Sequence, residues 1–133
     1  MREIGTTCCI AGGGPAGMML GFLLARAGVD VTVLEKHADF LRDFRGDTIH
    51  PSTMQLMQEL GLLDDFLKLP HTKERSIVAR FGDQDVPIAD FSHLPVEAPY
   101  IAFMPQWDFL DFLADRGKEL PHFKLLKIGR AHV

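Results

Sequence analysis

The sequence predicts an α/β fold in which a βαβ unit opens the chain and an antiparallel hairpin is inserted after it. Two observations favour this fold. A short apolar run ends in glycines before an apolar helical stretch, and two strand-like runs flank a polar turn later in the chain. The chain has 133 residues, of which 47% are hydrophobic and 24% charged, so it is long enough for one modest domain and too short for two.

The predicted βαβ unit lies within residues 6–35. Residues 6–11 are apolar and β-branched, which is typical of a buried parallel strand. Residues 15–27 form a helical stretch that Pro15 opens and Gly28 ends. Because this helix is apolar nearly all round, we expect protein to cover it on both sides. Residues 29–34 supply the second strand, which ends at Glu35.

A glycine-rich turn connects the first strand to the helix. Gly12, Gly14 and Gly17 occupy the glycine positions of a G-x-G-x-x-G pattern, which allows a tight turn, close approach of a pyrophosphate and close helix–sheet packing. The start of the helix attracts phosphate. Glu35 lies 18 residues after Gly17, near the offset of about 20 residues at which an acid binds the adenosine ribose and disfavours NADP. The complete pattern predicts a Rossmann-like dinucleotide site rather than a purely structural turn.

The rest of the chain departs from a plain NAD-binding domain, which would continue with alternating strands and helices. The predicted elements, in order, are a polar connection over residues 36–46, helices over 51–60 and 62–69, hairpin strands over 76–81 and 86–91 around a turn at 82–85, a strand over 100–104, a helix over 105–120 and a strand from 123.

Three motifs carry a family resemblance that covers residues 6 to about 126. The first is the Gly-Gly-Gly-Pro-Ala-Gly turn at residues 12–17 with Glu35, the second is the basic loop at residues 45–53, and the third is Met-Pro-Gln-Trp at residues 104–107. With these motifs the chain resembles the flavoprotein aromatic hydroxylases, the group typified by para-hydroxybenzoate hydroxylase. The resemblance implies a Rossmann-like FAD-binding βαβ unit with an inserted β-hairpin, in an incomplete domain.

The resemblance also implies a set of cofactor-binding residues. The glycine turn would hold the FAD pyrophosphate, Glu35 would hold the adenosine ribose, Arg45 would approach the phosphates or the ribityl chain, and Gln106 would hydrogen-bond the cofactor from the other side. Arg45 could instead be a surface cation, and Gln106 could cap its helix. The full implied set is Gly12, Gly14, Pro15, Ala16, Gly17, Glu35, Lys36, Arg45 and Gln106.

By the same resemblance, the parent enzyme would use NAD(P)H and O2 to hydroxylate an aromatic or conjugated small molecule. Another FAD-dependent reductase, dehydrogenase or halogenase is an alternative, as is an NAD-binding module without flavin. The family's later glycine-aspartate motifs, which hold the rest of FAD, have no counterpart here, and no catalytic residue can be assigned because the catalytic residues would lie beyond this stretch. We therefore expect this stretch to be inactive by itself.

Composition and spacing argue against several other partners. The net charge of −4 argues against nucleic acid, and the longest apolar run, residues 15–25, is shorter than the roughly 20 residues that span a membrane. Cys8 and Cys9 are adjacent in a predicted strand and would point to opposite faces, so they suit neither a disulfide nor a metal. The histidines lack metal-ligand spacing. We expect a reduced, cytoplasmic protein without a secretory signal.

The final six residues form a separate segment in this prediction. Residues 128–133 resemble one reading frame of a sequencing-adapter oligonucleotide, and a natural strand end followed by a loop is the alternative. The predicted division is therefore residues 1–127, the N-terminal part of an FAD-binding domain, and residues 128–133, an artefact.

Overall fold

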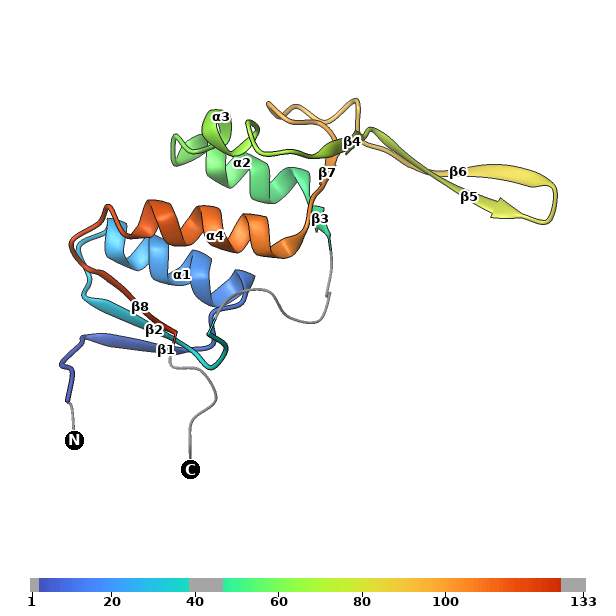
Figure 1. The fold of residues 1–133 in the computed structure, drawn as a ribbon. Coiled ribbons are helices and arrows are strands. Elements are labelled where there is room, and N and C mark those ends of the chain that lie inside the picture. Colours follow the sequence, from blue (N-terminus) through green and yellow to red (C-terminus); the bar gives the residue numbers. More distant parts are fainter. Residues whose placement is uncertain (1–2, 39–46, 128–133) are drawn as a thin grey trace. The chain divides into compact units, whose positions relative to one another are not determined.

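The computed structural model describes residues 3–38 and 47–127, which fall into two units (Figure 1). The first unit contains residues 3–38 and 107–127, and the second contains residues 47–106. Arg45 and the segment 128–133 lie outside the described residues.

The first unit is built on a three-stranded parallel sheet. Its strands are β1 (Cys8–Ala11), β2 (Val31–Glu35) and β8 (Phe123–Lys127), in the order β1-β2-β8. Val31 lies between Cys8 and Phe123 in the register, so these three side chains share one face of the sheet. The predicted opening βαβ unit is confirmed, and β8 continues its parallel sheet.

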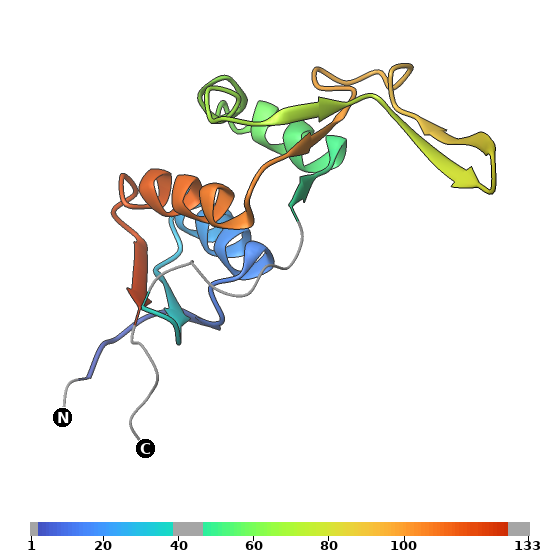
Figure 2. The ribbon, with the colours of Figure 1, turned by 45° about the vertical axis from the view of Figure 1, so that its right-hand side comes forward.

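Two helices cover one face of this sheet (Figures 1 and 2). They are α1 (Pro15–Arg26) and α4 (Gln106–Gly117), of which α4 belongs to this unit from Trp107 onward. Both helices approach Phe123 closely: a Cβ added at Gly21 of α1 would lie 3.2 Å from its ring, and one added at Gly117 of α4 would lie 2.7 Å from it. Small residues therefore let both helices lie close to the strands.

On the opposite face of the sheet, the edge strand β1 is exposed in the described part of the chain. Cys9 and Ala11 are exposed, so the prediction of a fully buried first strand is wrong. The physical reason is that both helices pack on the other face. The apolar helix α1 is only partly covered in the described part of the chain, since Leu20 is 48% exposed while Met18 and Phe22 are buried. This agrees with the expectation that further protein is needed to cover it.

The second unit combines a small antiparallel sheet with two helices. Chain order is β3 (Thr48–Ile49), α2 (Pro51–Glu59), α3 (Leu63–Phe66), β4 (Thr72–Glu74), β5 (Ser76–Phe81), β6 (Gln84–Asp90) and β7 (Ile101–Phe103). β7 pairs with both β3 and β4, and neither of these two short strands was predicted. The second predicted helix is also shorter than expected, since tighter turns follow Phe66, with the N–H of Leu69 donating to its carbonyl.

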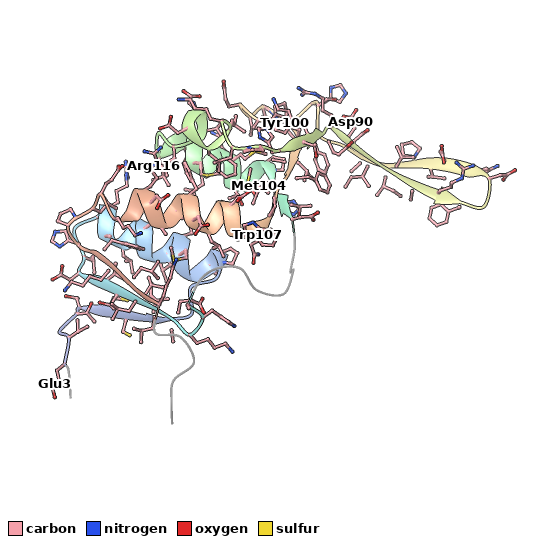
Figure 3. The ribbon with its side chains drawn as sticks, in the orientation of Figure 1. Glu3, Asp90, Tyr100, Met104, Trp107 and Arg116 are labelled. Carbon is pink, nitrogen blue, oxygen red and sulfur yellow. The ribbon has the colours of Figure 1, made fainter. Side chains whose placement is uncertain are left out.

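Strands β5 and β6 form the predicted hairpin, with a shorter turn than expected. Phe81 pairs with Gln84, so the loop contains only Gly82 and Asp83. Gly82 has φ +66 and Asp83 has no positive φ, which is the glycine-first pattern of a type II′ turn. The predicted four-residue turn is therefore wrong, because glycine permits a two-residue connection. Figure 3 marks Asp90 at the end of β6.

Glycines end α1 and α2 as predicted. Gly28 has φ +88, and beyond it the N–H of Val29 donates to the carbonyl of Leu24 at 3.0 Å. The end of α2 repeats this arrangement at Gly61, which has φ +74. Both ends are Schellman motifs, in which a left-handed residue lets orphan carbonyls accept hydrogen bonds.

Replacing Gly28 by alanine should destabilise the protein through its backbone alone, because a Cβ there would meet no atom within 4 Å. We expect Gly28→Ala to lower the free energy of unfolding by about 1–2 kcal/mol, the penalty of the left-handed conformation. Gly5→Ala is the matched control, since Gly5 is equally open without positive φ. Urea denaturation of the two variants checks this, and equal stabilities would contradict it.

Candidate functional site

A cleft of about 440 Å³ opens where β1 and β2 end. In a parallel sheet the carboxyl ends of neighbouring strands lie at one edge, where open α/β sheets bind ligands. The turn after β1 and the residues at the end of β2 therefore meet at this edge. The cleft is lined by Ala11, Gly12, Gly13, Gly14, Leu34, Glu35 and Lys36.

Backbone geometry explains two of the predicted glycines. Gly12 has φ +116, a conformation that other residues rarely adopt, and its N–H donates to the carbonyl of Leu34 at 2.8 Å. A Cβ at Gly17 would overlap the carbonyl oxygen of Gly12. The first turn of α1 thus lies directly against the turn that leaves β1.

The start of α1 keeps its backbone N–H groups available. Gly14 is the N-cap and Pro15 the first helical residue, and no side chain among the described residues caps this end. Uncapped N–H groups and the positive end of the helix dipole form an anion-binding arrangement. Ala16 is exposed in the same first turn, and neither Pro15 nor Ala16 lines the cleft.

Glu35 is the buried charge of the site. It is only 2% exposed, and both of its carboxylate oxygens accept hydrogen bonds. The N–H of Gly13 donates to Oε2 at 3.0 Å, the N–H of His37 donates to Oε1 at 3.0 Å, and the Nδ1 of His37 lies 2.9 Å from Oε1. Burying a carboxylate requires such donors. The acid at the end of β2 is therefore held in place at the glycine turn.

Within the first unit, the structure brings four of the predicted site residues to one cleft. Gly12, Gly14, Glu35 and Lys36 line one cleft, and the side chain of Lys36 adds an exposed positive charge. Gln106 belongs to the second unit and is the first residue of α4. Arg45, as noted, lies outside the described residues.

Two residues of the site were missed in the sequence. A Cβ at Gly13 would lie 2.8 Å from the Oε2 of Glu35, so this position also requires glycine, although the motif leaves it unspecified. His37 contacts the same carboxylate through its backbone and its ring. The sequence offered two signals for these residues. Gly13 is one of three consecutive glycines, and His37 lies two residues after the acid.

The described residues, 3–38 and 47–127, hold no group of three or more histidine, cysteine, aspartate or glutamate side chains placed to bind a metal. Within the same residues, no helix combines the length and apolar character needed to cross a membrane.

Comparison with known protein families finds a match over most of the chain. The family model described as the FAD binding domain matches residues 5–130, which includes the glycine turn, Glu35 and α4.

Individual relatives are similar over most of this chain. It is 28% identical to 6-methylpretetramide 4-monooxygenase of Streptomyces rimosus, over 91% of the chain and 29% of the relative. It is 33% identical to an uncharacterized aromatic compound monooxygenase of Bacillus subtilis, over 84% of the chain and 21% of the relative. Among solved structures, p-nitrophenol 4-monooxygenase from Pseudomonas putida superimposes with a TM-score of 0.77 and 27% identity, covering 96% of this chain and 32% of that one. The chain thus spans less than a third of each.

Alanine substitutions at two glycines of the turn should destabilise the protein to different extents. Gly17→Ala places a Cβ on the backbone oxygen of Gly12, so we expect a loss of about 3 kcal/mol in the free energy of unfolding. Gly13→Ala instead meets Oε2 and Cβ of Glu35, at 2.8 and 3.0 Å. Because a side-chain oxygen can shift more easily than a backbone oxygen, its loss should be smaller, about 1–2 kcal/mol. Chemical denaturation measures both, and the reverse order would refute this description of the turn.

Proposed function

This chain belongs to the FAD binding domain family, and from that membership we propose that the whole protein is a flavin-dependent monooxygenase that hydroxylates an aromatic or conjugated small molecule. The names of the relatives support this reaction, since the three similar proteins described above are all monooxygenases. NAD(P)H as reductant, O2 as oxidant and a cytoplasmic location complete the proposal, and the free thiols of Cys8 and Cys9 are consistent with a reducing compartment.

The observation that carries the proposal is the buried Glu35 beside the glycine turn. We assign the FAD pyrophosphate to the backbone of Gly12, Gly14 and Gly17 and to the start of α1 with Pro15 and Ala16, because uncapped N–H groups and the helix dipole favour phosphate. The adenosine ribose is assigned to Glu35, whose carboxylate can accept hydrogen bonds from hydroxyl groups. Lys36 lines the same cleft and can offset phosphate charge.

Arg45 and Gln106 complete the proposed cofactor contacts. Both lie within the part of the chain that matches the FAD binding domain, residues 5–130. A guanidinium binds phosphate oxygens through charge-assisted hydrogen bonds, and a glutamine amide can donate and accept hydrogen bonds.

The chain's own residues bind and orient, and the bound flavin supplies the redox chemistry. The turn and the helix start would hold the diphosphate, and the carboxylate of Glu35 would accept hydrogen bonds from the hydroxyls of the adenosine ribose. The catalytic and substrate residues are proposed to belong to parts of the whole protein that residues 1–127 do not include. Residues 1–127 alone are therefore proposed to bind FAD weakly and to be inactive.

Removing the carboxylate of Glu35 should weaken FAD binding. In the whole protein that carries this sequence, we expect Glu35→Ala to raise the Kd of FAD by roughly 10- to 100-fold, since hydrogen bonds to a charged group are lost. Glu59→Ala, which removes an exposed carboxylate on α2, is the control and should leave the Kd unchanged. Quenching of flavin fluorescence measures both, and an unchanged Kd in Glu35→Ala would remove Glu35 from the site.

Measurement of O2 consumption distinguishes the proposed hydroxylation from the alternative reactions. The whole protein, reconstituted with FAD and given NAD(P)H with a panel of phenols, should consume O2 in a substrate-dependent manner and form a hydroxylated product. Substrate reduction without O2 uptake would indicate a reductase instead. Tight NAD binding with no FAD binding would identify a nucleotide-binding module and overturn the proposal.

A further inference from the structure

Among the described residues, both backbone N–H groups and a histidine ring contact the Glu35 carboxylate. The N–H groups of Gly13 and His37 belong to the backbone, and the path of the chain places them at 3.0 Å from Oε2 and Oε1. The ring of His37 is different, because its Nδ1 lies 2.9 Å from Oε1 only as long as residue 37 carries that side chain. When Glu35 is ionised, its carboxylate can only accept hydrogen bonds, and the ring then donates from Nδ1.

This contact differs from an ordinary surface ion pair. Lys68 and Asp65 also approach to 2.9 Å, but both are well exposed, and solvent weakens such pairs. In the Glu35 pair the carboxylate is 2% exposed and the ring 37% exposed. The ring therefore lies at the edge of the site with its donor directed at a buried charge, where a hydrogen bond is less screened.

The ring adds a further donor to the backbone N–H groups of Gly13 and His37 that restrict the last torsion of the Glu35 side chain. Rotation of a glutamate carboxylate about its last bond is broad and roughly two-fold, so the plane of the group needs donors to fix it. The two adjacent hydroxyls of a ribose need acceptor directions that are set before binding, because ordering them during binding lowers affinity.

We propose that His37 is a positioning residue, which holds the plane of the Glu35 carboxylate in the orientation that receives the ribose hydroxyls of the adenosine. The inference rests on the proposed placement of the FAD ribose at Glu35. His37 acts through Glu35 and needs no contact of its own with the cofactor.

Two substitutions test the ring in the whole protein, stripped of flavin. His37→Leu removes the donor and keeps an apolar side chain of moderate size. His37→Asn is the conservative variant, since its amide nitrogen stands at the same distance along the side chain as Nδ1 and can donate to the same oxygen. Thermal melts of both variants establish that they are folded before binding is measured.

Two probe ligands separate positioning from general structure. ADP carries both ribose hydroxyls, and 2′,3′-dideoxy-ADP carries neither, so titration calorimetry with the pair isolates the interaction with Glu35. We expect His37→Leu to weaken ADP binding about tenfold, to leave dideoxy-ADP binding unchanged, and to be rescued to within about twofold of the wild type in His37→Asn. In a Glu35→Ala background the His37→Leu effect should vanish, because contacting residues are coupled.

Other results would overturn the positioning role of His37 or the cofactor placement on which it rests. Wild-type ADP affinity in His37→Leu overturns the positioning role, and so does an equal loss for both ligands or a failure of His37→Asn to restore binding. If the wild type itself binds ADP no better than dideoxy-ADP, the ribose is not at Glu35, and the proposed cofactor placement fails together with this inference.

Discussion

The hydrogen bond between the N–H of Gly13 and the Glu35 carboxylate is the interaction on which the site depends. It joins the turn after β1 to the end of β2, two segments 22 residues apart in the sequence. A buried carboxylate without donors would be strongly unfavourable, so the turn must present its backbone to β2. A Cβ at Gly13 would therefore lie 2.8 Å from the Oε2 of Glu35, and Gly12 adopts a positive φ in the same turn. The cleft is the space that remains beside this contact.

The packing of α1 on the strands also holds the glycine turn in place. Gly17 lets the first turn of the helix touch the carbonyl of Gly12, and Gly21 lets the next turn lie against Val33 in the central strand. The start of the helix is thus fixed relative to the strand end that carries Glu35. A phosphate-binding helix start and a ribose-binding carboxylate require such fixed spacing, because an ADP group must contact both at once.

The first βαβ unit and the helix ends could be predicted from local sequence patterns. Pro15, Gly28 and Gly61 act within a few residues of their own position, so their roles could be predicted without the fold. Strands β3 and β4 could not be predicted, because two or three residues show no alternation and their pairing with β7 joins distant parts of the chain. Gly13 and His37 were missed for a related reason. Their importance follows from the burial of Glu35, which only the folded structure shows.

A crystal structure of the whole protein with bound FAD tests the central claim most directly. The account predicts that both ribose hydroxyls of the adenosine lie within hydrogen-bonding distance of the Glu35 carboxylate, at roughly 2.5–3.0 Å, with the diphosphate at the Gly12–Gly17 turn. A cofactor whose ribose lies away from Glu35, or whose diphosphate avoids the start of α1, would contradict it.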